Sequence, residues 1–161
     1  MVFKVYQLMT WGNPPSPAFK AVTANGTGVY FIQSDRQKPL NYMMINKNRQ
    51  YVAYAEQYSA DGKPVWKIWH GTEDLGFVNI SENEISTYDF NGAGLHVSTS
   101  SGSILQGITI FTNNEGATVG RLYFGAEQLK RCWILEVNSP EQAVPCIMLT
   151  FIMTKQHRLT T

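Results

Sequence analysis

Hydrophobic residues along this chain fall in short runs, and turn-forming residues separate the runs about every 8 to 12 positions. Val29–Ile32 is a typical run, because β-branched and aromatic side chains favour extended strands. The separators contain Asn, Asp and Gly, which accept the positive φ that tight hairpins require. They are Asn25-Gly26, Asp61-Gly62, Asn91-Gly92 and Asn113–Gly116. The pattern is typical of a mainly β domain with antiparallel strands.

About twelve segments have a strand-forming composition. They are Phe3–Met9, Phe19–Val22, Val29–Ile32, Tyr42–Ile45, Gln50–Tyr54, Pro64–Trp69, Gly76–Ile80, Ser86–Phe90, Leu95–Ser98, Ile108–Phe111, Val119–Phe124 and Cys132–Val137. Strict alternation fails in Val65–Trp69, which predicts a strand covered on both faces or one with an exposed aromatic side chain. The Pro-rich stretch Gly12–Pro17 lies too close to the N-terminus to separate two domains. We therefore expect a single domain over residues 1–161.

The pattern changes at Asn138, where helical signals begin. Ser139 offers an N-cap hydroxyl, Pro140 stands where its missing N–H costs no hydrogen bond, and Gln142 is placed to close a capping box. Ala143–Met153 is apolar on every face, which predicts a helix buried inside the domain. Five of its side chains should be nearly inaccessible to solvent: Ile147, Met148, Leu149, Phe151 and Ile152.

Two alternatives remain open for this C-terminal segment. Pro145 would break the interior of a helix, so the first turn should be separate and the continuous helix should begin close to Pro145. Ile147–Met153 would also suit a last buried strand. A transmembrane segment is disfavoured, because the run of about eleven apolar residues falls short of the roughly 20 that cross a bilayer.

Composition narrows the classes of partner. The chain has 13 Lys and Arg, 12 Asp and Glu, and a formal charge of +1. Because it lacks the basic stripe that binding to a phosphate backbone requires, we expect no nucleic-acid partner. Residues 1–10 lack a basic region followed by an apolar stretch, so we expect no signal peptide and a cytoplasmic location. The two cysteines are too few for a disulfide framework and should be buried thiols.

The sequence contains no motif that predicts catalysis. The three histidines, His70, His96 and His157, have neither the spacing of zinc ligands nor a neighbouring cysteine cluster, so we expect no metal and no cofactor. Glycine-rich phosphate-binding patterns and the nucleophile-elbow pattern are also absent from the sequence. Cys132 follows two basic residues and is the better candidate for a reactive thiol, although apolar neighbours disfavour this role. We expect a protein that is not an enzyme.

The C-terminal third of the chain combines two recognisable segments. Cys132–Pro140 has a strand with a tryptophan and a short polar link, and the apolar segment Val144–Met153 follows it. Ile110–Gly120 has a strand, a turn with glycine and the start of another strand. In these segments the chain resembles the tubby-like C-terminal domain superfamily, which includes phospholipid scramblases and plant LURP-one-related proteins, and it is most similar to small fungal members. The resemblance implies an antiparallel β-barrel of about twelve strands that encloses one apolar C-terminal helix.

The resemblance also implies a function, the non-enzymatic binding of phosphoinositide head groups through surface Lys and Arg. No basic motif of the family has a match in this chain, and the nearest substitutes are basic pairs in predicted loops or at strand ends. We expect Arg36, Lys38, Lys47 and Arg49 to bind an anionic phospholipid head group. A further basic pair is Lys130-Arg131. The protein would then be a binding or scaffold protein that attaches peripherally to a membrane.

Exposed aromatic residues offer an alternative function. Trp11, Trp66, Trp69 and several tyrosines could form stacking platforms for a carbohydrate or a contact surface for a protein. Aromatic residues in strands are more often part of a core, and Trp11, beside the Pro-rich stretch, is the one that we most expect to be exposed. The alternative is therefore a lectin-like or protein-interaction β domain.

Overall fold

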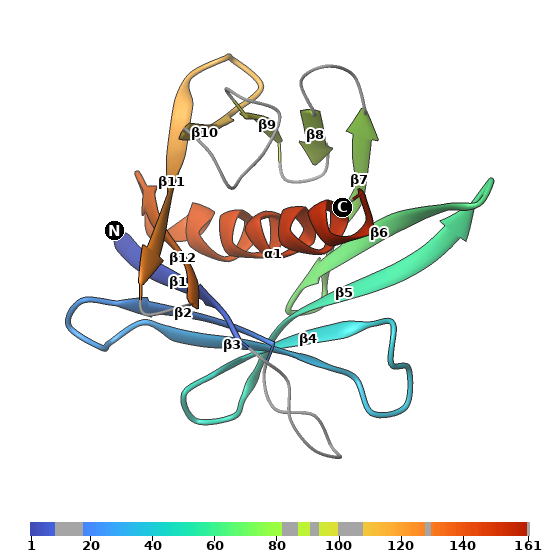
Figure 1. Ribbon diagram of the computed structural model, residues 1–161, viewed down its shortest axis with the longest axis horizontal. Coiled ribbons are helices and arrows are strands. Elements are labelled where there is room, and N and C mark those ends of the chain that lie inside the picture. The colour runs from blue at the N-terminus through green and yellow to red at the C-terminus, as the bar shows by residue number, and fades with distance from the viewer. Residues whose placement is uncertain (9–17, 82–86, 91–93, 100–107, 128–129, 161) are drawn as a thin grey trace.

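The structure is a computed structural model that describes residues 1–8, 18–81, 87–90, 94–99, 108–127 and 130–160. These residues form a closed antiparallel β-barrel around one helix, α1 (Ala143–Thr160), which a short 3-10 helix, η2 (Pro140–Gln142), precedes (Figure 1). The twelve strands are β1 (Val2–Gln7), β2 (Phe19–Thr23), β3 (Val29–Ser34), β4 (Tyr42–Asn46), β5 (Tyr51–Ala60), β6 (Lys63–His70), β7 (Glu73–Ser81), β8 (Thr87–Phe90), β9 (Leu95–Thr99), β10 (Ile108–Thr112), β11 (Thr118–Glu127) and β12 (Lys130–Val137).

Each strand pairs with its neighbours in the sequence, and β1 pairs with β12 to close the barrel. The N-terminus takes part in this closure. The Met1 ammonium donates to the Val137 carbonyl over 2.9 Å, and the Val137 N–H donates to the Met1 carbonyl over 2.9 Å. Closure leaves the sheet without the unpaired edges that invite pairing with other chains. The expected fold class, a β-barrel of about twelve strands around a C-terminal helix, is confirmed.

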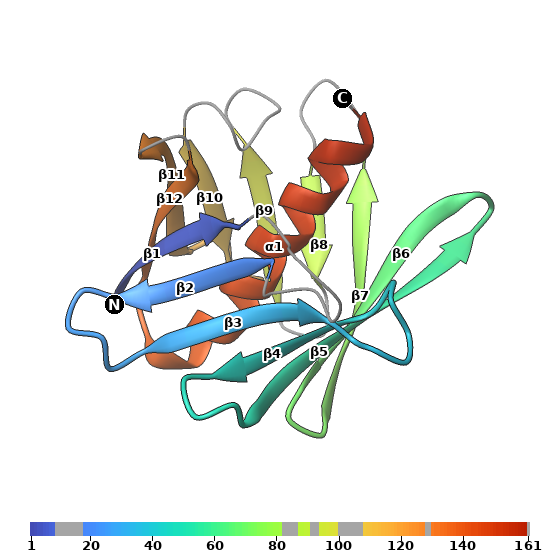
Figure 2. The same cartoon turned by 60° about the horizontal axis from the view of Figure 1, so that its bottom comes forward.

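The strands occupy the twelve segments expected from the sequence, and β5 differs most from the expectation. It continues to Ala60, whereas the sequence pattern predicts an end at Tyr54. Figures 1 and 2 show that the far ends of β5 and β6 project from the barrel as a hairpin. Because no helix lies beneath this projecting part, its residues need no alternation of polar and apolar side chains. The hydrophobic pattern therefore ends before the strand does.

The turns confirm the expected use of positive φ. Gly26 has a φ of 71°, Gly116 has 81°, and Asp61 and Gly62 in the β5–β6 turn have 53° and 77°. Asn91-Gly92 lies outside the described residues, as do Met9 and Ser86 at the ends of two predicted strands. Local turn chemistry thus connects the strands on either side of these described turns, as an up-and-down barrel requires.

The helix begins where the sequence predicts, but its N-terminus is built differently. Ser139 has the extended conformation of an N-cap and Pro140 follows it, yet the Ser139 side chain makes no capping hydrogen bond, so the predicted capping box is wrong. Instead, the Ser139 carbonyl accepts the Gln142 N–H over 3.2 Å and closes a 3-10 turn. Pro145 is the third residue of α1, where an N–H has no intrahelical partner to lose. The alternative of a last buried strand is wrong.

The helix is the core of the domain. Every residue from Ala143 to Thr154 is buried, and the five side chains expected to be inaccessible are at most 1% exposed. Figure 1 shows α1 crossing the barrel, with β2–β4 below it and β7–β10 above it. Phe151 lies in an aromatic cluster, with ring centres 4.8 Å from Tyr42, 5.6 Å from Phe19 and 6.4 Å from Trp66. Within the described part of the chain, no helix has both the length and the apolar character needed to cross a membrane.

Candidate functional site

The strand pair β3–β4 carries apolar side chains on both of its faces. Ile32 and Met44 point into the barrel and are fully buried. The residues that alternate with them, Phe31, Met43 and Ile45, lie half-buried on the outside. Phe31 and Ile45 are partners in the register of the two strands. These three outer side chains form an apolar floor that packing against α1 does not explain.

The turn from β4 to β5 presents two cations at one end of this floor. The side-chain oxygen of Asn46 accepts the N–H groups of Asn48 (2.9 Å) and Gln50 (3.0 Å). The Arg49 N–H donates to the Asn46 carbonyl over 3.0 Å, and Arg49 has a φ of 61°, which is uncommon for a residue with a side chain. Hydrogen bonds to Asn46 therefore fix the backbone from which the exposed Lys47 and Arg49 project.

The turn from β3 to β4 carries the other two predicted cations, Arg36 and Lys38, and both are exposed. In the same turn, the Asp35 carboxylate accepts hydrogen bonds from the Tyr54 hydroxyl and from the Gln37 N–H. The bond from Tyr54, followed by that from Gln37, lowers the pKa of Asp35. Burial, followed by the bond to Asp35, raises the pKa of Tyr54 to about 12. Asp35 is therefore ionised, and its carboxylate is engaged by Tyr54 of β5 and by Gln37 of its own turn.

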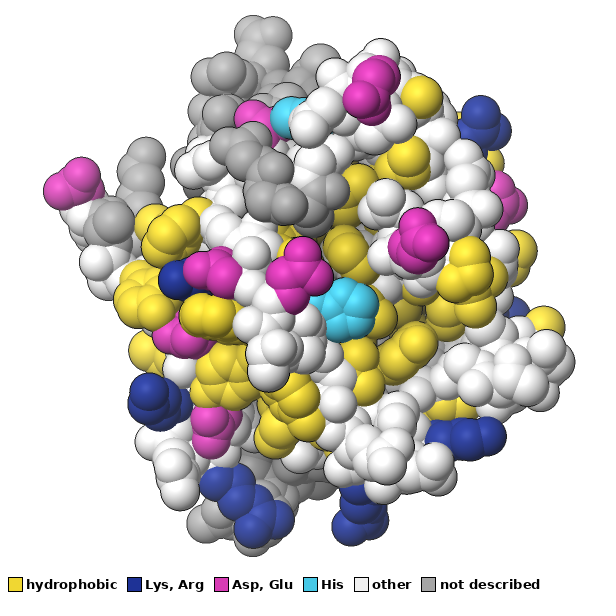
Figure 3. Space-filling view, turned by 180° about the vertical axis from the view of Figure 1, so that it is seen from behind, with side chains coloured by type: hydrophobic (Ala, Val, Ile, Leu, Met, Phe, Trp, Pro, Cys, Tyr) yellow, Lys and Arg dark blue, Asp and Glu magenta, His cyan; other side chains and the backbone are white. Residues whose placement is uncertain are grey.

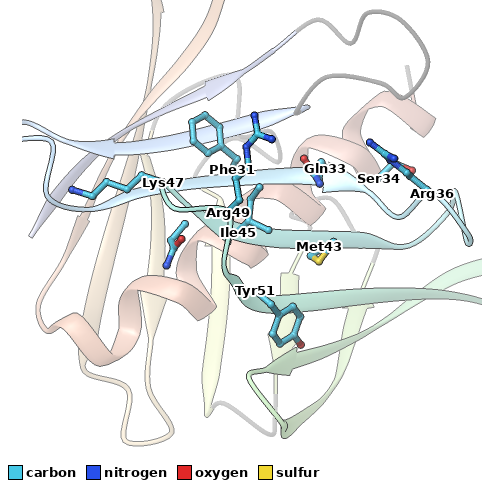
Figure 4. A pocket seen from close by; sticks show the side chains of 10 residues that line it. Phe31, Gln33, Ser34, Arg36, Met43, Ile45, Lys47, Arg49 and Tyr51 are labelled. Atoms are coloured by element: carbon cyan, nitrogen blue, oxygen red, sulfur yellow. The ribbon is translucent and has the colours of Figure 1, made fainter.

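A surface pocket of about 580 Å³, here called the β3–β5 pocket, lies over the apolar floor (Figure 4). Three of the four predicted site residues line it, and Lys38 does not. Among the described lining residues, three carry a positive charge and none carries a carboxylate. The lining residues are Phe31, Gln33, Ser34, Arg36, Met43, Ile45, Asn46, Lys47, Arg49 and Tyr51.

The cations of the β3–β5 pocket come from the turns at both ends of β4. Figure 4 shows Lys47 toward one end of the strand pair, Arg36 at the other end, and Arg49 beside Phe31 between them. Because β4 has five residues, the two turns are about 16 Å apart. The four predicted cations therefore do not form one cluster. Lys47 and Arg49 belong to the β4–β5 turn, and Arg36 and Lys38 belong to the β3–β4 turn.

The region around the pocket is more basic than the rest of the chain. Between Ala18 and Ser59 there are five Lys and Arg and two acidic residues, although the whole chain has a formal charge of only +1. Lys20 adds a cation near the pocket, because its amine lies 5.6 Å from the centre of the Phe31 ring. Figure 3 shows Lys and Arg along the lower edge of the molecule, on the side of β2–β5, and most acidic side chains above them. This side is expected to attract anions.

Sequence reasoning missed the apolar floor and Lys20. A signal for the floor exists, because Met43, Met44 and Ile45 are consecutive apolar residues in a strand with only one face toward the core. Lys20 is recognisable only through the register that pairs it with Phe31. The other basic pair of the sequence lies elsewhere: Arg131, at the start of β12, donates from Nη1 to the Gln7 side chain over 3.5 Å.

A second surface, on β5–β7, carries exposed aromatic rings. Tyr58 and Phe77 are 46% and 47% exposed, and their ring centres are 6.2 Å apart. The Lys67 amine lies 4.7 Å from the centre of the Trp69 ring and 5.5 Å from that of Phe77, and it pairs with the Asp74 carboxylate over 3.0 Å. These five residues are called the aromatic surface below. Figure 3 shows hydrophobic and charged side chains interleaved on the left, where the β5–β6 hairpin lies in this view.

One of the tryptophans considered for such a surface is buried, and another lies outside the described residues. Trp66 is 1% exposed and packs against Phe151, so it belongs to the core and cannot contribute to a stacking platform. The two faces of β6 alternate, so that Trp66 and Ile68 face the core while Lys67 and the half-buried Trp69 face outward. Trp11 lies outside the described residues.

The residues considered for catalysis or metal binding are dispersed. Nδ1 of His96 lies 2.8 Å from the Asp89 carboxylate, and Nε2 lies 2.9 Å from the Asn114 side-chain oxygen. These bonds, that to Asp89 first, raise the pKa of His96. Cys132 is only 5% exposed, and burial raises the pKa of Cys146 to about 12. Both thiols are buried, as expected, and in the described part of the chain no three His, Cys, Asp or Glu side chains are grouped to hold a metal ion.

Comparison with models of known protein families, with curated proteins and with solved structures finds no match to this chain. The distinguishing features of the site are an outer apolar floor, a positive charge at each end and a pair of hydrogen-bonded turns that hold the cations in place.

Proposed function

We propose that this chain is a non-enzymatic binding module that holds the anionic head group of a phospholipid, a phosphoinositide in particular, in the β3–β5 pocket. The proposal is carried by a pocket with three cations and no carboxylate among its described lining residues. Lys and Arg bind phosphates through charge-assisted hydrogen bonds, which are about twice as strong as neutral ones. The module attaches peripherally to the cytoplasmic face of a membrane.

Lys47 and Arg49 hold the head group in this proposal. The Arg49 guanidinium supplies a planar pair of donors to one phosphate, and the Lys47 ammonium supplies a point charge to the next. Both are exposed, so water and salt screen them, and the affinity of each contact is modest. The fixed β4–β5 turn compensates in part, because a site that is already ordered loses less entropy on binding.

The barrel interior supports an external site. In barrels that carry a ligand inside, the interior is left open, whereas here α1 fills it with side chains from Ala143 to Thr154. The inner residues of β3 and β4, Ile32 and Met44, are also fully buried. A ligand of this domain therefore binds on the outside of the wall.

We also propose that the chain belongs to the tubby-like superfamily. The arrangement of twelve strands around a C-terminal helix agrees with what the resemblance of Cys132–Met153 implies. A shared architecture alone is a weak argument for function, because one fold serves many activities. The proposal of lipid binding therefore depends on the pocket and takes only its ligand class from the resemblance.

Calorimetry with soluble inositol trisphosphate tests the proposed function. The wild type should bind at low salt, and the double variant Lys47→Gln/Arg49→Gln should lose about 2 kcal/mol of binding free energy, at about 1 kcal/mol for each cation. Arg121→Gln, which removes an exposed cation from β11, is the matched control and should bind like the wild type. Absence of binding by the wild type, or equal weakening by the control, would contradict the proposal.

The aromatic surface supports a second candidate, binding of a carbohydrate. Tyr58 and Phe77 expose nearly half of their area, and aromatic rings of this kind stack on the apolar faces of sugars. A glycan array should then give signals that Tyr58→Ala and Phe77→Ala abolish. Signals that persist in both variants would reject this candidate, and binding of a protein at the same residues would establish the interaction-domain alternative.

A further inference from the structure

The β3–β4 turn exposes the apolar side chain of Leu40 and engages the polar side chains of Asp35 and Asn41 in hydrogen bonds. Among the described residues, Leu40 is the most exposed large hydrophobic side chain, at 68%, whereas its polar neighbour Asn41 is only 7% exposed. The Asn41 side-chain oxygen accepts the Gln57 N–H over 3.0 Å, and Asp35 accepts bonds from Tyr54 and Gln37. In a turn that contacts only water, we would expect the side chains of Asn41 and Asp35 to be exposed and that of Leu40 to be covered.

Hydrogen bonds on both sides of Leu40 make this exposure a property of the fold. The Ser34 hydroxyl donates to the Pro39 carbonyl over 2.8 Å, immediately before Leu40. Immediately after it, the Asn41 N–H donates to the Lys38 carbonyl over 2.8 Å, and the Asn41 carbonyl accepts the Asp35 N–H over 2.9 Å. The backbone at Leu40 is therefore held in place, so the direction of its Cα–Cβ bond is set by the fold.

The neighbours of Leu40 identify what covers it. Arg36 and Lys38 are exposed in the same turn, and Arg36 also lines the β3–β5 pocket. An exposed apolar side chain in the same turn as two cations matches an anionic bilayer, where an aliphatic side chain enters the acyl boundary and Lys and Arg remain at the level of the phosphates. A protein partner would need an apolar pocket for Leu40 with acidic residues around it. No feature of the described residues indicates so specific a partner, so we favour the bilayer.

We propose that the β3–β4 turn inserts Leu40 into the interface of an anionic bilayer while Arg36 and Lys38 contact the phosphates around it. This inference depends on the proposed head-group function and adds to it a membrane anchor and an orientation. The outside of β3–β5 faces the bilayer, with Leu40 at one end and Lys47 and Arg49 about 16 Å away, at the other end of β4. One end inserts, and the other end binds the head group of a different lipid.

A polarity-sensitive fluorophore on Leu40→Cys tests the insertion. Labelling is selective because both native cysteines are buried. On addition of vesicles of phosphatidylcholine, phosphatidylserine and a phosphoinositide, the emission should shift to the blue, and lipids with a quencher near the head group should quench it. Ala117→Cys is the matched control, because Ala117 is exposed in the β10–β11 turn, on the opposite side of the barrel in Figure 1, and its emission should not change.

Affinity measurements separate this inference from the proposed function. Leu40→Ser should weaken vesicle binding about tenfold, the effect of leaving one aliphatic side chain out of the interface, and should leave binding of soluble inositol trisphosphate unchanged. Lys47→Gln/Arg49→Gln should weaken both. Three outcomes would contradict one or both proposals. If Leu40→Ser binds vesicles like the wild type and the label does not shift, the insertion is wrong, and the head-group function still stands if the trisphosphate binds.

If neither trisphosphate nor vesicles bind, both proposals are wrong. If a second copy of the chain shields the label in the absence of vesicles, the membrane anchor is wrong.

Discussion

Replacement of Phe151 by alanine tests whether the helix holds the barrel together. The Phe151 ring is 1% exposed and lies within 6.4 Å, centre to centre, of aromatic rings from β2, β4 and β6. Truncation of a buried phenylalanine costs about 3 to 5 kcal/mol through lost burial and the cavity that remains. A closed barrel cannot move three hydrogen-bonded strands inward to fill that cavity, so we expect a cost near the upper end of the range. This is a large fraction of the 5 to 15 kcal/mol, roughly, that stabilises a typical domain.

Equilibrium unfolding in urea measures this cost. With an m-value of about 2 kcal/mol per molar, a loss of 4 kcal/mol lowers the midpoint by about 2 M, and the m-value itself should not change. Phe77→Ala is the matched control, because the same truncation at a side chain that is 47% exposed should cost less than about 1 kcal/mol. A Phe151→Ala variant that loses no more stability than Phe77→Ala would refute the placement of α1 in the core.

Three further predictions concern charge, pH and thiol chemistry. Replacing Arg36, Lys38, Lys47 and Arg49 by Gln should abolish sedimentation with anionic vesicles without lowering the melting temperature, and wild-type binding should fall steeply between low and physiological salt, because screening limits the attraction to about 8 Å. Vesicle binding that does not change with salt concentration would contradict this electrostatic mechanism. An NMR titration of His96 should give a pKa above 6.5, and Asp89→Asn should lower it. Because the pKa is raised on folding, the stabilisation is present below pH 6.5 and is lost as the pH rises through the folded pKa, so unfolding midpoints should decrease in that window. Cys132 and Cys146 should react with a thiol reagent only after unfolding, and rapid labelling of the native protein would show that one of them is accessible.

The strands could be predicted because their signals are local. Turn residues with positive φ, such as Gly26 and Gly116, mark the ends of strands, and the residues between them alternate with a period of two. The buried helix was predictable for a related reason, since Ala143–Met153 offers no polar face to water. Its capping was not predictable from the sequence. The hydroxyl and the carbonyl of Ser139 can both accept a hydrogen bond from the first turn, and the bond that forms runs from the Gln142 N–H to the Ser139 carbonyl.

The site was only half predictable from the sequence. Arg36, Lys38, Lys47 and Arg49 could be selected because basic residues in turns are accessible, but their grouping depends on strand register and on the positive φ of Arg49. Trp66 shows the same limit, because a shift of one residue along β6 exchanges its buried and exposed faces. Which aromatic residue faces solvent is decided by the barrel as a whole.

The inner faces of β3 and β4 contribute to stability, and their outer faces form the proposed binding surface. Their inner residues, Ile32 and Met44, are fully buried in the core with α1, so selection for folding acts on them directly. Their outer residues, Phe31 and Ile45, are half-buried without help from the helix, and apolar side chains in that position cost solubility unless something covers them. A bilayer or a lipid head group with its attached glycerol would cover them, and the cations at both ends of β4 would give that contact its preference for anions. The same strand can therefore support the helix with its inner side chains and offer its outer side chains to the proposed ligand.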